Sequence, residues 1–184
     1  RAPRTGARHG GKPITLAHVI HPGIVDRASD LFIAQPVTFA TMETARKFAG
    51  DAVVVQMRAV LFADEQEMSL PAAFDKLPRL ERSIADLKPF RLRRKLALIR
   101  DILDAGIEGS DADFVIYSNV DIALQPHFYP AVAAIVRQGY DAFVINRRTI
   151  PSLYDDVGQI PLMYAEIGEP HPGYDCFVFK RDLY

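Results

Sequence analysis

The residues with the clearest capacity for chemistry are Asn119 and Asp121, which stand two positions apart directly after a short apolar run. A carboxamide and a carboxylate at this spacing can direct oxygen atoms into the same space, and Mg²⁺ and Mn²⁺ prefer oxygen ligands. The same residue types are also common in turns, and Pro126 soon begins a predicted helix, so the spacing alone favours a turn. The position at a strand end and the nearby arginines leave both interpretations open.

Two groups of basic residues could bind an anion near this motif. Arg147 and Arg148 follow a second apolar run, and Arg94 lies within the basic residues 93–95 at the start of a predicted helix. Arginine presents a planar fork that suits phosphate oxygens. Cations at a helix N-terminus oppose the helix dipole, which hints at an anionic partner for residues 93–95. A solvated helix face is the preferred interpretation there.

A last group of polar residues precedes the final apolar run, residues 176–179. Asp175 stands at its start and could serve as a general base, while a turn role fits it equally well. His171 could contribute to binding of a metal or phosphate, and Glu166 is a weaker alternative base. Cys176 lies among aromatic and β-branched residues, so we expect a buried thiol and no nucleophile.

The elements that must position these residues alternate between apolar runs and segments of helical period. The pattern predicts strands over residues 14–20, 52–62, 113–118, 142–146 and 176–179, and helices over residues 36–48, 91–105 and 126–138. Residues 64–90 are expected to form an irregular excursion with one or two helical turns, and residues 149–174 mostly a loop. This order predicts an α/β fold, with a mostly parallel open sheet and helices on both faces.

In an open α/β sheet, ligands bind beyond the carboxyl ends of the strands. That rule places His21, Asp121 and Arg147 at one edge. The pattern Asp-Ala-Asp at residues 111–113 precedes a strand, so it lies at the opposite edge and is interpreted as a turn. His18 alternates with apolar neighbours inside the first strand, where a hydrogen-bonded core histidine is expected.

Length and composition set limits on the class of protein. The chain has 184 residues, 49% of them hydrophobic and 24% charged, which excludes disordered and fibrous classes. One cysteine excludes an internally disulfide-bonded fold, and a net charge of −1 argues against a general nucleic-acid surface. The apolar runs are too short for a transmembrane helix.

Charge also suggests how the chain is organised. The first 25 residues contain four basic residues and no acidic one, and residues 1–12 are predicted to form a flexible basic tail. A solvated leader is the preferred interpretation of this tail over contact with phosphate or a membrane surface. Residues 13–184 are expected to form one domain, truncated at its C-terminus. The expected location is the cytoplasm, with peripheral membrane attachment as the alternative.

The segment IYSNVDIAL lies between the predicted helix RRKLALIRDIL and the residues Pro126-His127-Phe128-Tyr129. In this setting it resembles the Asp-X-Asp region of nucleotide-sugar glycosyltransferases with the GT-A fold. The resemblance implies that Asp121, with Asn119, holds Mn²⁺ or Mg²⁺ against the donor diphosphate. Asn119 departs from the family pattern, and a carboxamide brings no charge to offset dehydration of the cation.

The resemblance also implies roles for the other candidate residues. The stretch from Ala17 to Gly23, which includes His21, would hold the nucleotide base and ribose, and Asp175 would face the acceptor. Arg94 or Arg147 would neutralise phosphate charge.

The expected substrates are a uridine or guanosine diphosphate sugar and a saccharide or other hydroxyl acceptor, without nucleic acid. Two alternatives remain: a non-catalytic nucleotide-sugar-binding or interaction module of the same fold, and an unrelated α/β enzyme acting on a phosphorylated metabolite. The chain contains no G-x-S-x-G, G-x-x-x-x-G-K-[ST], G-x-G-x-x-G or H-E-x-x-H sequence.

Overall fold

One six-stranded sheet organises the chain. The computed structural model describes residues 12–77, 80–89, 91 and 95–184. The strand order is β3-β2-β1-β4-β8-β5, with bounds β1 Ile14–Ile20, β2 Val53–Ala59, β3 Phe74–Lys76, β4 Phe114–Ser118, β5 Ala142–Ile145 and β8 Cys176–Lys180. Strands β3, β2, β1 and β4 pair in parallel, whereas β8 runs antiparallel to both β4 and β5. The predicted mostly parallel open α/β sheet is confirmed.

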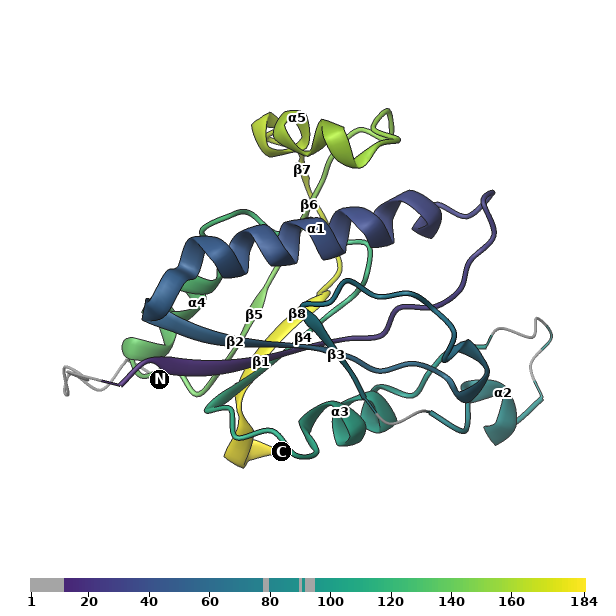
Figure 1. Cartoon of the computed structure of the whole chain (residues 1–184), viewed down its shortest axis with the longest axis horizontal. Helices are drawn as coiled ribbons and strands as arrows, with labels where there is room; N and C mark the ends of the chain where they lie inside the picture. The colour runs from purple at the N-terminus through teal and green to yellow at the C-terminus, as the bar shows by residue number, and fades with distance from the viewer. Residues whose placement is uncertain (1–11, 78–79, 90, 92–94) are drawn as a thin grey trace.

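Helices cover both faces of this sheet, as predicted (Figure 1). The alternation of side chains along β1 divides the core into two layers. Leu16 and Ile20 pack with α1 (Leu31–Ala49) and α4 (Phe128–Arg137), whereas Val19 packs on the other face with α3 (Ile99–Ile107). The remaining helical elements are short: α2 Ile84–Leu87, α5 Ile160–Ala165, η1 Gly50–Ala52, η2 Ala63–Glu65, η3 Val157–Gln159 and η4 Arg181–Leu183.

Helix α1 begins at Leu31, five residues before the predicted start at Pro36. Proline favours the first helical position because it lacks an N–H group, and this preference suggested the later start. Tertiary contacts extend the helix instead. The buried side chain of Gln35 donates to the carbonyl of Gly23 and accepts from its N–H, each over 2.9 Å, which fixes the first turns of α1 against the loop after β1.

Helix α3 begins at Ile99, so the prediction of a helix from residue 91 is wrong for residues 95–98. Ala97 instead forms an antiparallel bridge with Ser83, and this pairing holds the chain extended. Gly106 was expected just beyond the helix, yet it lies within the last turn. A Cβ atom at Gly106 would stand 2.4 Å from Cγ1 of Val19, so glycine is required there for α3 to approach the sheet closely.

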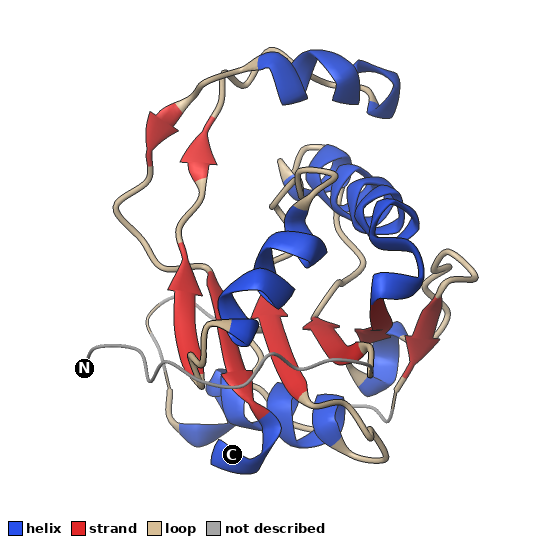
Figure 2. Cartoon of the chain, turned by 90° about the vertical axis from the view of Figure 1, so that its left-hand side faces the viewer, coloured by secondary structure: helices blue, strands red, loops and turns tan. Residues whose placement is uncertain are grey.

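Residues 149–174 contain more regular structure than the expected loop. A two-stranded antiparallel ribbon, β6 (Arg148–Thr149) and β7 (Glu169–Pro170), carries η3 and α5. This ribbon rises from the sheet and places α5 beyond α1 (Figures 1 and 2). Arg148 braces the ribbon, because its guanidinium donates to the carbonyls of Ile167 and Gly168. We call residues 148–170 the arm.

The predicted basic tail lies almost wholly outside the described residues, which begin at Lys12. In the part of the chain that the structure describes, none of the helices combines the length and hydrophobicity needed to cross a membrane.

A buried polar network crosses the sheet at His18, which has no exposed surface. Its Nδ1 lies 2.9 Å from the hydroxyl of Tyr129 and its Nε2 lies 2.8 Å from Oγ of Ser118. These bonds satisfy both ring nitrogens of a histidine in the core, as the sequence predicted. Burial lowers the pKa of His18 from 6.5 to about 3, because the charged form would lose its hydration.

We expect this histidine to make stability dependent on pH. Between pH 6.5 and about 3, His18 takes up a proton in the unfolded chain but not in the folded chain, so stability is lost as the pH falls. Urea unfolding at pH 7 and pH 5 should show about 2 kcal/mol lost to His18, and His18→Gln should lack this part of the loss. His21 is present in both proteins, so its own contribution to the pH dependence of stability is the same in each and cancels in the comparison. The same loss in both proteins would contradict the assignment.

Candidate functional site

The carboxyl ends of β1, β4 and β5 share one edge of the sheet, and β8 begins there because it runs in the opposite direction. Cys176 at the start of β8 stands between Ser118 at the end of β4 and Ile145 at the end of β5. The polar residues that flank these strand ends are therefore brought together. We call five of them the Arg147 cluster: Asn119, Asp121, Arg147, His171 and Asp175.

The guanidinium of Arg147 lies at the centre of this cluster. Its Nη1 donates to Oδ2 of Asp121 over 2.7 Å, and its Nε lies 2.9 Å from Oδ2 of Asp175. The second contact has the distance of an ion pair without the alignment of a hydrogen bond. The Arg147 side chain is 25% exposed, so solvent screens these pairs only in part. One cation therefore holds two carboxylates at the strand ends.

Asp175 is the more enclosed carboxylate, with 15% of its side chain exposed against 35% for Asp121. Nδ2 of Asn119 donates to its Oδ1 over 3.2 Å, and the Asn119 N–H donates to its carbonyl over 3.3 Å. These contacts hold the Asp175 side chain in place beside the end of β4. Its predicted role as a general base stays a prediction.

His171 completes the cluster from the base of the arm. Arg147 Nη2 lies 3.2 Å from His171 Nε2. In this hydrogen bond Nε2 accepts, because a guanidinium can only donate. The other ring nitrogen, Nδ1, lies 3.2 Å from Oγ1 of Thr149. Asn146 also donates to the His171 carbonyl over 2.8 Å, so the arm is attached to the site through hydrogen bonds.

Asp121 is positioned by helix α1. Oγ1 of Thr38 donates to the Val120 carbonyl over 2.8 Å and accepts from the Ile122 N–H over 3.2 Å. Thr41 accepts from the Leu124 N–H in the same way over 3.1 Å. Both threonines are buried. The loop that carries Asp121 is thus fixed on both sides of that residue.

Sequence reasoning missed Thr38 and Thr41. They stand three residues apart beside the predicted apolar face of the helix, which includes Phe39 and Met42. Two hydroxyls on a face that must be buried need hydrogen-bond partners, and that requirement was the available signal.

The structure does not bring every predicted site residue together. His21 lies at the same edge, but its Nδ1 donates to the carbonyl of Val60, just after β2, over 2.7 Å, and its ring contacts Phe62 edge-on. Burial lowers the pKa of His21. Within the described residues, no hydrogen bond or ion pair joins His21 to the Arg147 cluster.

Two other basic candidates remain. Arg94 lies outside the described residues. Its neighbour Lys95 pairs with Asp64 and stacks over Phe62 at 4.2 Å. Arg148 was a candidate for binding an anion together with Arg147. Its guanidinium instead points into the arm.

The Asp-Ala-Asp pattern and Cys176 lie where the sequence predicted, and the role of Glu166 as an alternative base stays a prediction. Asp113 accepts from the Thr15 N–H at the amino edge, where the rejected Asp-Ala-Asp pattern was expected. Cys176 is buried, and desolvation raises the pKa of its thiol to about 12. Glu166 accepts from the hydroxyl of Tyr154 within the arm.

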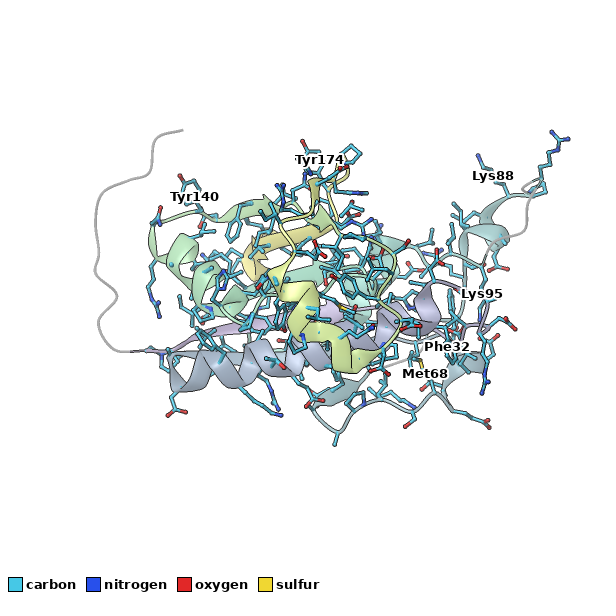
Figure 3. All side chains as sticks on the ribbon, turned by 90° about the horizontal axis from the view of Figure 1, so that it is seen from above. Phe32, Met68, Lys88, Lys95, Tyr140 and Tyr174 are labelled. Atoms are coloured by element: carbon cyan, nitrogen blue, oxygen red, sulfur yellow. The ribbon has the colours of Figure 1, made fainter. Side chains whose placement is uncertain are left out.

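A hollow of about 480 Å³ lies beside the loop after β1. It is lined mainly by apolar side chains, including Ile24, Phe32 and Met68. Figure 3 shows Phe32 and Met68 close together at the end of the molecule that also carries Lys95. Next to it, a Cβ atom on Gly23 would stand 3.3 Å from Oε1 of Glu65, and Oε2 of Glu65 is buried without a hydrogen-bond partner.

The residues present do not fit the divalent metal that the family resemblance implies. Arg147 stands between the two carboxylates, and Asn119 directs its Nδ2 donor to Asp175. Over residues 12–77, 80–89, 91 and 95–184, no three His, Cys, Asp or Glu side chains are grouped as metal ligands.

Comparisons with known proteins add no family assignment. No protein-family model matches the chain, and a search of curated proteins finds no relative.

We expect Arg147 to stabilise the fold as well as the site. Arg147→Gln leaves two partly buried carboxylates without their cation, which should cost about 1–3 kcal/mol in urea unfolding. The double variant with Asp121→Asn should reveal a coupling of about 0.5–3 kcal/mol. Arg100→Gln removes the same charge from an exposed i,i+4 pair with Asp104 and should change stability by less than about 0.5 kcal/mol. Equal losses for Arg147→Gln and Arg100→Gln would contradict a structural role for the cluster.

Proposed function

We propose that this chain binds a nucleoside-diphosphate sugar at the carboxyl edge of the sheet and transfers the sugar to a hydroxyl acceptor. The observation that carries the proposal is the convergence of Asp121, Arg147 and Asp175 at that edge. In open α/β sheets this edge is where ligands bind, above all where the strand order reverses. Here the order reverses between β1 and β4, which are directly followed by His21 and Asn119.

The hollow beside β1 suits the nucleoside. Its volume of about 480 Å³ falls within the range of small-molecule sites. Phe32 and Met68 offer apolar surface to a base. The unpartnered Oε2 of Glu65 could accept from a ribose hydroxyl beside Gly23, since a buried acceptor gains most from a new donor. This placement agrees with the role that the resemblance gives to residues 17–23.

The Arg147 cluster offers groups that would bind the sugar and assist the bonds that form and break. In net terms, the acceptor oxygen bonds to the anomeric carbon while the bond from that carbon to the diphosphate oxygen breaks. The acceptor proton passes to a carboxylate, for which Asp175 is the candidate, and the leaving diphosphate gains negative charge that Arg147 faces. Carboxylates that accept and a guanidinium that donates also match the hydroxyl groups of a sugar.

A non-catalytic nucleotide-sugar-binding module is the second candidate. It is favoured by the contacts of Asp175 with Arg147 and Asn119, because these contacts occupy the oxygens that a general base must direct to the acceptor hydroxyl. Binding and turnover measured on the same variants separate the two candidates.

The experiment is calorimetry of the full chain with a panel of uridine and guanosine diphosphate sugars, with donor-sugar hydrolysis measured in parallel. At least one donor should bind, and Phe32→Ala should weaken that binding about tenfold or more, since it removes a face for the base. Asp175→Asn should lower hydrolysis by about 10²-fold or more while binding changes little.

The matched control is Asp51→Asn, which removes an exposed carboxylate just before β2, at the opposite edge of the sheet. It should change neither binding nor hydrolysis. A panel in which no donor binds would overturn the proposed function. Binding that is retained together with hydrolysis unaffected by Asp175→Asn would favour the non-catalytic module.

A further inference from the structure

The Arg147 guanidinium stands between two carboxylates and an imidazole of this site. Oxygen atoms of Asp121 and Asp175 and the Nε2 atom of His171 all lie within 3.2 Å of its guanidinium nitrogens. Two carboxylates and an imidazole are donor groups that divalent cations use. A single fixed positive charge satisfies them here.

The guanidinium also opposes entry of a divalent ion. Arginine stays protonated in proteins, so an ion approaching Asp121 or Asp175 meets a like charge less than 3 Å from each carboxylate oxygen. A divalent cation would have to displace Arg147 from both carboxylates.

We propose that Arg147 is a built-in replacement for a divalent cation, and that the chain therefore holds the diphosphate of its ligand without a metal ion. The statement that the ligand carries a diphosphate rests on the proposed function. The statement that Arg147 excludes a metal ion does not depend on it. The guanidinium has five N–H groups: two donate to Asp121 and His171, and the one on Nε faces Asp175 in an ion pair without a hydrogen bond. Two N–H groups on a side chain that is 25% exposed remain to meet phosphate oxygens.

The first test measures Mn²⁺ binding to the nucleotide-free protein by calorimetry and electron paramagnetic resonance. The wild-type chain and the Arg100→Gln control should bind Mn²⁺ weakly and alike. Arg147→Gln should bind Mn²⁺ at least about tenfold more tightly, because two carboxylates and an imidazole lose their resident cation. Adding Asp121→Asn to Arg147→Gln should remove that gain.

A second variant covers the case in which Arg147→Gln does not fold. Arg147→Lys keeps the positive charge, so it should exclude Mn²⁺ as the wild type does, yet it lacks the fork that pairs with two carboxylates. Tight Mn²⁺ binding to the wild type that Asp121→Asn abolishes would overturn the proposal. So would a failure of folded Arg147→Gln to gain affinity for Mn²⁺.

The second test measures binding of UDP and GDP to the wild type in EDTA and in excess Mn²⁺. Affinity should agree within about twofold between the two conditions, and Arg147→Gln should lower it in EDTA by about tenfold or more. Binding that appears only with Mn²⁺ would overturn the proposal. If neither nucleotide binds in any condition, the proposed function is contradicted, while the Mn²⁺ comparison still decides the role of Arg147.

Discussion

The reversed direction of β8 is the constraint on which the candidate site depends. Because β8 lies antiparallel between β4 and β5, the chain enters it at the edge where those two strands end. Asp175 consequently stands beside Asn119, and the residues after β5 reach both. A parallel strand in the same position would place Asp175 at the opposite edge. The arm between β5 and β8 follows from the same geometry, since the chain leaves and re-enters the sheet at one edge.

Charge balance then determines what this edge can do. Two carboxylates placed close together repel each other. The positive charge of Arg147, which is part of the same chain, offsets that repulsion. Helix α1 supplies the other requirement, since Thr38 holds the backbone on both sides of Asp121. His171 links the cluster to the arm. The result is a polar site with its own cation, and an apolar hollow lies against α1 and the loop after β1.

Local patterns were sufficient for the parts of the fold that depend on local physics. The valine-rich and isoleucine-rich runs predicted the main strands, and the rule that ligands meet carboxyl strand ends predicted the edge shared by Asp121 and Arg147. The place of Asp175 at that edge depends on the antiparallel direction of β8, which was not predicted. Tertiary contacts decided the rest: Gln35 lengthens α1, and the bridge of Ala97 with Ser83 keeps residues 95–98 out of α3. The pairing of Arg147 with Asp121 and Asp175 could not be predicted from the sequence either, because the direction of one side chain depends on the packing of three strands.

The most direct measurement of the central claim is a structure of the chain with a bound uridine or guanosine diphosphate sugar. The account predicts the base in the hollow lined by Phe32, the diphosphate within hydrogen-bond distance of the Arg147 guanidinium, and no metal ion between Asp121 and the phosphates. A ligand at the amino edge, or a metal ion between Asp121 and Asp175 with Arg147 displaced, would contradict it.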